Sequence, residues 1–336
     1  MNTASSFAFG AVIGVGFEGT SLPLWLTEAL RTNTVGGIVL FRRNIDSLKQ
    51  VQKLCAAARE LAGGRLWIGI DEEGGRVRRL PEPFPQMPSA AKVAASGDPK
   101  EAYAVAQEQG RALRELGISV NFAPVLDVCV PGECPAVIGD RSYGDTAEKV
   151  ISFASAYVDG LQAEGIVSCG KHFPGHGSAS GDSHLMLPKL NIDRETWENR
   201  DALPFGWAAE YGVSGIMSAH VLTPSLGFEN TPATFCRELI TGHLREQEGY
   251  QGVIITDDLA MGAVGALFDN PANAAVQALA AGVDIAMHCG PEPGLDDIVQ
   301  AITQGIETGI LSKEQLAASA QRVERLWWKA GHRDAG

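Results

Sequence analysis

The amino-acid sequence of 336 residues predicts an α/β fold and, within that class, a single (β/α)8 TIM-type barrel over residues 1–336. Three observations support this prediction. Eight short apolar runs recur along the chain, helical patterns separate them, and polar clusters follow several of the runs. Alternation of strands and helices alone also fits an open, doubly wound sheet. The count of eight and the positions of the polar clusters favour the barrel.

Each apolar run has the length of a buried strand rather than of a helix, as is typical of parallel strands that are covered on both faces. The expected strands lie at 7–17, 36–41, 66–70, 120–127, 166–171, 215–221, 252–257 and 284–287. We expect no separate signal peptide in the first of these runs, because no basic region or small-residue cleavage site accompanies it.

The segments between the strands have helical spacing. In 48–61, for example, apolar residues recur at positions 51, 54, 58 and 61 and would form one helix face. The expected helices lie at 48–61, 101–116, 147–164, 194–211, 236–246, 272–281, 298–306 and 315–328. Asp98-Pro99 and Asn270-Pro271 combine an N-cap residue with proline at the first helical position, so each predicts a helix start.

The composition limits the partners of the protein. A net charge of −13 argues against a broad electrostatic surface for nucleic acid or an anionic membrane. No run of 18 apolar residues is free of glycine interruptions, so no membrane-spanning helix is predicted. We therefore expect no nucleic-acid or membrane partner, and favour a monomer.

Six cysteines in a chain of 336 residues do not form a disulfide framework. Cys169 and Cys289 lie in apolar runs and are expected to be buried thiols. Cys129 and Cys134 are close enough in sequence to pair or to bind a metal, but no histidine lies beside them. We expect no metal and no cofactor, and a reducing, cytoplasmic setting.

Polar residues gather at the ends of five expected strands, where the catalytic groups of a barrel lie. The clusters are Asp71 to Arg79, Asp127 with Asp140-Arg141 in the loop that follows it, Lys171 to His184, His220 and Asp257-Asp258. Any one of them could be a helix cap or an ion pair. Five clusters at one rim indicate instead a site that binds a polar ligand, because Lys, His and Asp are costly to bury without partners.

The absence of other motifs narrows the chemistry of this site. No ligand set of metalloenzyme spacing, no Gly-x-Ser-x-Gly turn, no phosphate-binding loop and no dinucleotide fingerprint occur in the sequence. Carboxylates, histidines, lysine and arginine remain. That set suits a hydroxyl-rich ligand and acid/base or nucleophilic carboxylate chemistry, of which glycoside cleavage is the leading case.

These motifs resemble glycoside hydrolase family 3, and in particular its single-domain bacterial β-N-acetylglucosaminidases of peptidoglycan recycling. The resemblance covers essentially the whole chain. It rests on Lys171-His172-Phe173-Pro174-Gly175-His176-Gly177 with Asp182-Ser183-His184, and on 70–77, Asn121 to Asp127 and Thr256 to Met261, which match in order and spacing.

The resemblance implies three catalytic residues. Asp257 would be the nucleophile, His184 the general acid/base, and Asp182 the residue that holds the His184 ring. A histidine suits this work, because imidazole titrates near neutral pH and an acceptor carboxylate fixes its tautomer. Five further residues would bind the sugar: Asp71, Arg79, Arg141, Lys171 and His172. Asp258 is expected to be a helix cap, and His220 is given no role.

Three alternatives stay open. The protein could be a β-glucosidase of the same family, a phosphorylase that transfers the sugar to phosphate, or a catalytically silent sugar-binding protein. Two stretches also depart from the family pattern: the loop 129–135, beside Arg141, and the proline-rich segment 80–88. Both leave the leaving group, and hence the natural substrate, open.

Overall fold

The computed structural model describes residues 10–180, 187–268 and 270–328. In this part of the chain the strands form one parallel eight-stranded sheet in the order β10-β1-β2-β3-β4-β5-β8-β9. A parallel bridge between Ile255 and Ile285 brings the two outer members of this order together, so the sheet closes. The prediction of a (β/α)8 barrel is confirmed. The strands are β1 (Ile13–Val15), β2 (Gly37–Leu40), β3 (Trp67–Ile70), β4 (Val120–Asn121), β5 (Val167–Phe173), β8 (Gly215–Ser218), β9 (Val253–Thr256) and β10 (Ala286–His288).

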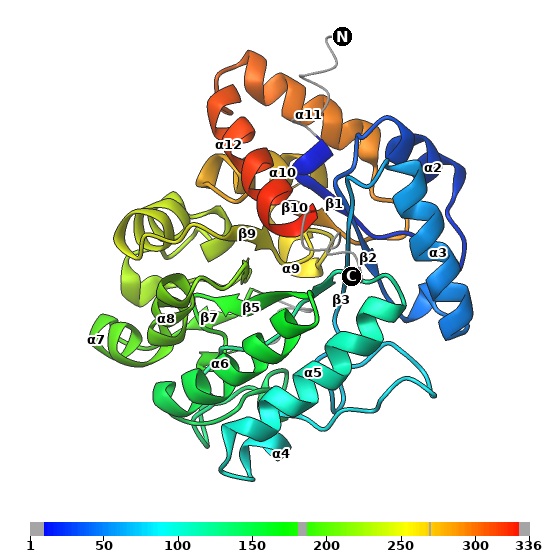
Figure 1. The fold of residues 1–336 in the computed structure, drawn as a ribbon. Helices are drawn as coiled ribbons and strands as arrows, with labels where there is room; N and C mark the ends of the chain where they lie inside the picture. The colour runs from blue at the N-terminus through cyan, green and yellow to red at the C-terminus, as the bar shows by residue number, and fades with distance from the viewer. Residues whose placement is uncertain (1–9, 181–186, 269, 329–336) are drawn as a thin grey trace.

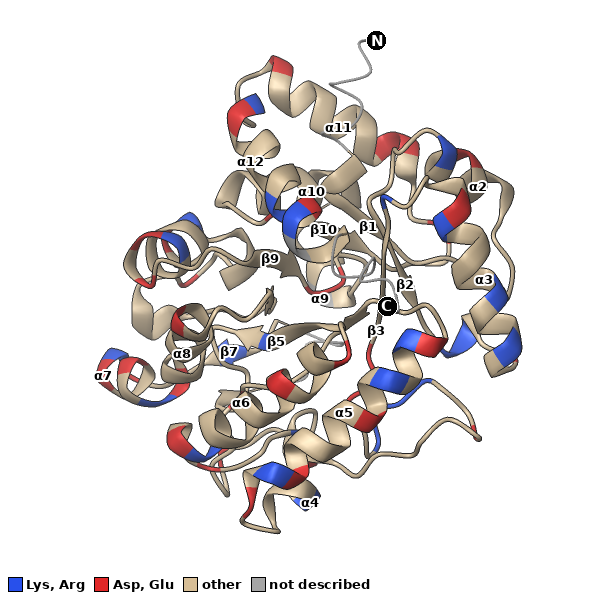
Figure 2. Ribbon diagram, viewed as in Figure 1, with Lys and Arg blue, Asp and Glu red and all other residues tan. Residues whose placement is uncertain are grey.

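Helices surround the ring of strands (Figure 1). The main ones are α2 (Leu24–Arg31), α3 (Leu48–Leu61), α4 (Ala90–Ala94), α5 (Pro99–Glu115), α6 (Ala147–Ala163), α8 (Leu203–Tyr211), η6 (Glu238–Gln247), α10 (Pro271–Ala281), α11 (Leu295–Glu307) and α12 (Lys313–Val323). The shorter α7 (Arg194–Thr196), α9 (Gly262–Gly265) and η7 (Glu324–Trp328) complete this set. Lys, Arg, Asp and Glu lie mostly on these outer helices (Figure 2).

Both predicted helix starts are confirmed. The Asp98 side chain accepts a hydrogen bond from the backbone N–H of Lys100 at 3.0 Å, and Asn270 accepts one from Ala272 at 2.9 Å. Several local predictions are wrong or incomplete. The helix expected over 315–328 divides into α12 and the π-helical η7. The helix expected over 194–211 is split into α7, a π-helical turn (Trp197–Asp201) and α8. The sequence reading missed α2, which follows Pro23, and the antiparallel pair β6 (Ala179–Ser180) and β7 (Lys189–Leu190).

Tryptophans close the end of the barrel at which the strands begin. Trp67, at the start of β3, packs edge-on against Trp327 of η7, with ring centroids 5.1 Å apart. The indole N–H of Trp327 donates to the Ser214 carbonyl, just before β8, and that of Trp328 donates to Gly36, just before β2. A Cβ at Gly37 would lie 1.8 Å from the Trp67 ring, so only glycine fits there. Because these tryptophans fill one end of the barrel, a ligand would enter from the opposite end.

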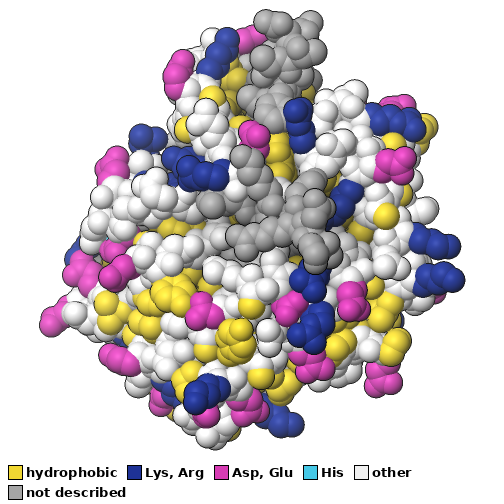
Figure 3. Space-filling model, in the orientation of Figure 1, with side chains coloured by type: hydrophobic (Ala, Val, Ile, Leu, Met, Phe, Trp, Pro, Cys, Tyr) yellow, Lys and Arg dark blue, Asp and Glu magenta, His cyan; other side chains and the backbone are white. Residues whose placement is uncertain are grey.

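On the face of the molecule in Figure 3, acidic and basic side chains are interspersed rather than gathered into a field of one sign. None of the described helices has the length and apolar character needed to cross a membrane.

Candidate active site

A cavity of about 290 Å³ opens at the carboxyl ends of the strands. Asp71 follows β3, Lys171 and His172 belong to β5, and Asp257 follows β9. These four side chains line the same cavity, together with Arg79 and Arg141. The structure therefore brings six of the eight predicted site residues together. The other two, Asp182 and His184, lie outside the described residues.

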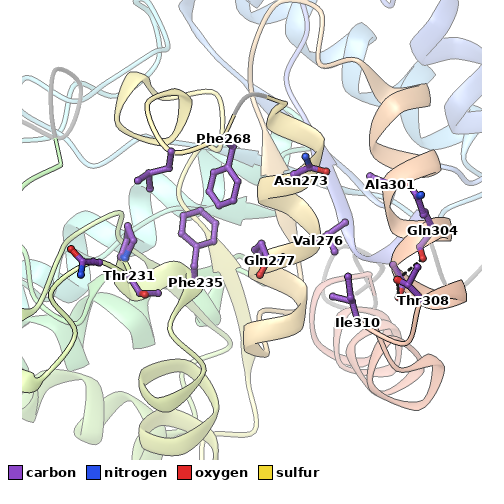
Figure 4. A pocket seen from close by; sticks show the side chains of 14 residues that line it. Thr231, Phe235, Phe268, Asn273, Val276, Gln277, Ala301, Gln304, Thr308 and Ile310 are labelled. Carbon is purple, nitrogen blue, oxygen red and sulfur yellow. Dashed lines mark hydrogen bonds between the residues drawn. The ribbon is translucent and has the colours of Figure 1, made fainter.

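A larger cavity of about 650 Å³ lies elsewhere, between the 230–235 segment, α10 and α11 (Figure 4). Phe235 and Phe268 lie side by side in its lining, with their ring centroids 5.0 Å apart. Among the described residues, its lining contains amides, hydroxyls and apolar groups but no Asp, Glu, His, Lys or Arg. Because acid/base or nucleophilic catalysis needs such groups, the smaller cavity at the strand ends is the candidate active site.

Lys171 is the central cation of this site. Its side chain is 2% exposed, and its ammonium lies 2.7 Å from Asp71 Oδ1 and 2.6 Å from Glu73 Oε1. Burial alone would lower the pKa of Lys171, but the two carboxylates outweigh burial and raise the pKa above its usual value. Lys171 is therefore fully charged at neutral pH and joins β5 to the loop that follows β3.

Arg141 binds Glu73 with the geometry of a fork. Its Nε and Nη2 each lie 2.8 Å from one oxygen of that carboxylate, and its Nη1 donates to the Val137 carbonyl at 3.0 Å. Lys171 and Arg141 together overcome the effect of burial on Glu73 and hold its pKa below the usual value. The sequence reading did not assign Glu73 to the site. The sequence feature that could have indicated it is the run of three acidic residues, Asp71-Glu72-Glu73, directly after β3.

Asp71 completes this charged network. One oxygen contacts Lys171, and the other lies 3.4 Å from Arg79 Nη2. Burial would raise the pKa of Asp71, but Lys171 and Arg79 lower it below its usual value. At neutral pH the wall of the cavity thus carries fixed carboxylates and fixed cations in contact. Such an array offers both acceptors and donors to the hydroxyls of a sugar.

His172 is held by Asp127, a second residue that the sequence reading left out of the site. His172 Nδ1 lies 2.7 Å from Asp127 Oδ2, and the other oxygen of Asp127 accepts the backbone N–H groups of His172 and His176. Burial, followed by Arg141 and Lys171, lowers the pKa of His172 well below its usual value. His172 is therefore neutral, with its Nδ1–H on Asp127 and its Nε2 toward Arg141, 3.3 Å away.

Asp257 lies directly after β9, and its backbone N–H donates a hydrogen bond to the Ser218 carbonyl. One oxygen of its carboxylate accepts the backbone N–H of Asp258 at 2.7 Å. Asp258 instead turns back into the loop, where Oδ1 accepts N–H groups from Ala260 and Cys289. The expected helix cap at Asp258 is wrong, because α9 begins at Gly262 with Met261 as its N-cap. Asp258 holds the loop beside Asp257.

His220 also supports this loop. Its Nδ1 lies 3.0 Å from Thr234 Oγ1, and its Nε2 lies 3.1 Å from the Asp258 carbonyl. The ring is buried, and burial lowers its pKa. His220 is not among the residues that line the cavity.

Cys129 and Cys134 form a disulfide in the loop after β4. The four other cysteines are buried thiols, as expected for Cys169 and Cys289. The carbonyls of residues 136–138, which follow the disulfide, accept hydrogen bonds from the Arg76 guanidinium, and Val137 and Ile138 line the cavity. The segment that directly follows the departing loop 129–135 therefore forms part of one wall of the site. No cluster suited to a metal ion occurs among the described residues.

Glu72 predicts a measurable pH dependence of stability. Its buried carboxylate accepts the backbone N–H groups of Arg79 and Leu80, and burial raises its pKa from 4.5 to about 7. The folded state therefore binds this proton more tightly than the unfolded state. The resulting stabilisation is present below about pH 4.5 and is lost as the pH rises through about 7. We expect Glu72→Gln to flatten the decline of unfolding free energy between pH 5 and pH 8, measured by urea denaturation.

A matched control for this prediction is Glu108→Gln, a substitution of the same chemistry on the exposed face of α5. It should leave the slope of the wild-type curve in place. A Glu72→Gln protein whose stability still falls with the wild-type slope across this pH range would contradict the assignment.

The closed ring of parallel strands, with charged groups gathered at its carboxyl end, defines the class of (β/α)8 barrel enzymes. A comparison with protein families identifies the particular one. Residues 25–326 match the family described as "Glycosyl hydrolase family 3 N terminal domain". This chain belongs to glycosyl hydrolase family 3, which confirms the family resemblance and the prediction of a glycoside hydrolase.

Named relatives agree with this assignment. A "Beta-hexosaminidase" of Thioalkalivibrio sulfidiphilus is 38% identical over 282 residues, which is 81% of this chain and 78% of that protein. A family 3 β-N-acetylglucosaminidase from Paenibacillus sp. superposes with a TM-score of 0.92 at 36% identity, over 98% of this chain but only 63% of that one. NagZ from Neisseria gonorrhoeae, solved with N-trifluoroacetyl-D-glucosamine, gives a TM-score of 0.77 at 31% identity, over 93% and 97% of the two chains.

Proposed function

We propose that this protein is a retaining exo-β-N-acetylglucosaminidase, which removes terminal β-linked N-acetylglucosamine from the non-reducing end of a glycan. The observation that carries the proposal is the position of Asp257, which shares one small cavity with the paired charges of Asp71, Lys171 and Arg141. The printed names of relatives that are 38% and 36% identical, and the sugar analogue in the Neisseria structure, support the same substrate.

Asp257 is the proposed nucleophile. Its carboxylate attacks the anomeric carbon, and the bond to the leaving oxygen breaks as a glycosyl ester forms. We assign the proton on the leaving oxygen to His184, with Asp182 orienting its ring. His184 then takes a proton from water, the resulting hydroxide attacks the anomeric carbon, and Asp257 is released. Two displacements at one carbon return the sugar with its original β configuration.

The remaining predicted residues bind the sugar ring in this proposal. Asp71 and the neutral His172 offer acceptors to its hydroxyls, while Arg79, Arg141 and Lys171 offer donors. Each of these groups is already fixed by another protein group, for example Lys171 by Asp71 and Glu73. A fixed array costs little reorganisation when the charged transition state forms, which is the property that electrostatic catalysis needs.

Peptidoglycan fragments are the proposed natural source of substrate, and a single-domain monomer is the proposed form of the protein. A cytoplasmic location remains part of the proposal. The Cys129–Cys134 disulfide weighs against it, because disulfides persist mainly in oxidising compartments. Thiol labelling of protein taken rapidly from cells distinguishes the two settings, since a cytoplasmic protein would present both of these cysteines to the reagent.

The proposal predicts selectivity between two chromogenic substrates. We expect kcat/KM for nitrophenol release from the β-N-acetylglucosaminide to be at least about a hundredfold higher than for the β-glucoside. A ratio of this size corresponds to roughly two good hydrogen bonds made only to the preferred substrate. Asp257→Asn, which keeps the shape of the side chain, serves as the control for contaminating activity. Faster release from the glucoside would overturn the proposal, and a sugar 1-phosphate in phosphate buffer would identify a phosphorylase instead.

A further inference from the structure

His176 is a buried histidine whose ring has no partner in the described structure. The residue is 3% exposed and lines the candidate active site. Neither of its ring nitrogens has a hydrogen-bond partner, and no other described histidine leaves both nitrogens buried in this state. The sequence reading placed His176 in the family motif but gave it no role.

Unpaired buried nitrogens are uncommon, because a folded protein gives nearly all of its buried polar atoms a partner. No other described protein group supplies a partner for the two ring nitrogens of His176. Such groups therefore call for an explanation at the site where they occur. His176 lines a cavity that His172 and Asp257 also line, so the explanation is to be sought in what this cavity binds.

The backbone fixes His176 in this position. Its N–H donates to Asp127 Oδ1 at 2.7 Å, within the same carboxylate that orients His172. The next residue, Gly177, packs so closely against the neighbouring loop that a Cβ would lie 2.0 Å from the Val128 carbonyl. The chain thus holds the unpaired imidazole at the cavity wall instead of letting it turn away.

We propose that His176 is a further sugar-binding residue, which hydrogen-bonds a hydroxyl of the bound monosaccharide. A neutral imidazole offers one donor and one acceptor, which is the complement of a hydroxyl group. Its neighbour His172 is 6.0 Å away between ring centroids, with Nδ1 already on Asp127. The two rings would contact different hydroxyls of one sugar. This inference rests on the proposed glycosidase function of the same cavity.

The test uses the full chain and a series of nitrophenyl β-N-acetylglucosaminides that lack the 3-, 4- or 6-hydroxyl. His176→Phe keeps a flat ring of similar size but removes both nitrogens. We expect kcat/KM on the parent substrate to fall about tenfold, the effect of one lost hydrogen bond. We expect the melting temperature of the variant to equal or exceed that of wild type, because the substitution breaks no hydrogen bond to another side chain or to the backbone of the described residues.

The decisive readout is coupling between the variant and one hydroxyl. One deoxy substrate should lose about tenfold in wild type and show no further loss in His176→Phe, as a double-mutant cycle requires when the same bond is removed twice. Equal losses for every deoxy substrate in both proteins would overturn the proposal. A lower melting temperature with an unchanged deoxy pattern would also overturn it, because that result describes a packing residue.

His288 supplies a matched control. It is 2% exposed and has an unpaired Nε2, but it does not line the cavity. His288→Phe should leave the deoxy pattern as in wild type. If His176→Phe fails to fold, His176→Leu, which also lacks any side-chain donor or acceptor, decides the question on the same substrates by the same coupling. A wild-type protein that cleaves only β-glucosides would overturn the proposed function, and deoxy glucosides would still test His176.

Discussion

Asp257→Ala should lower kcat for glycoside hydrolysis by about 10⁴-fold or more, the scale seen when a covalent catalyst is removed. The reason is its position: Asp257 ends β9 inside the cavity, and Asp258 turns its carboxylate into the loop. Removal of Asp257 leaves the sugar-binding network of Asp71, Lys171 and Arg141 in place. KM should therefore change far less than kcat, which steady-state kinetics on the chromogenic substrate would show.

Two further measurements identify the nucleophile itself. A slow fluorinated substrate should label Asp257 in the wild-type protein, as read by peptide mapping. Asp258→Asn is the matched control, since an amide oxygen can still accept the N–H groups of Ala260 and Cys289. That variant should keep most of its activity. A label on Asp258, or equal losses of activity in the two variants, would contradict the assignment of Asp257 as the nucleophile.

The sequence was sufficient to locate all eight strands, because buried parallel strands are short apolar runs that the pattern displays directly. It was also sufficient to place Asp71, Lys171 and Asp257 at one rim, since the ends of parallel strands meet at one end of a barrel. Where the fold has no periodic signal, prediction failed. The break within 194–211 falls at a π-helical turn, which is a local change of hydrogen bonding that side-chain periodicity does not reveal.

The site residues that sequence reasoning missed act through other residues. Asp127 lies at the end of the expected strand 120–127, but its two contacts with His172 and its contact with His176 come from a segment about 45 residues further along the chain. Glu73 was one of three consecutive acids, and only the fold shows that it binds Lys171 and Arg141 while Glu72 turns to the backbone of Arg79. Such pairings depend on which face each side chain takes, which the fold decides.

Lys171→Met should be the most destabilising single change in the site. Met keeps an unbranched apolar side chain but removes the ammonium that contacts Asp71 and Glu73 at 2.7 and 2.6 Å. The carboxylates of Asp71, 20% exposed, and Glu73, 7% exposed, would then lie close together with only arginines as ion-pair partners. Removing one partner of a buried ion pair typically costs about 3–5 kcal/mol of unfolding free energy, because the remaining charge is uncompensated. Urea denaturation at pH 7 measures this loss.

A double variant separates the effect of charge from that of packing. Lys171→Met with Glu73→Gln removes the uncompensated carboxylate while leaving an amide that can still accept from Arg141. We expect it to regain a large part of the stability lost in Lys171→Met, but not the activity, because Lys171 also faces the sugar cavity.

The pH dependence of the stability gives a second check. Loss of Lys171 raises the pKa of Asp71 and Glu73, since Lys171 is the strongest of the charges that lower both values. Lys171→Met should therefore gain stability relative to wild type as the pH falls and these carboxylates become protonated. If the deficit of Lys171→Met is the same at pH 5 and pH 8 and the double variant recovers nothing, the loss comes from packing, and the charged network does not hold the site together.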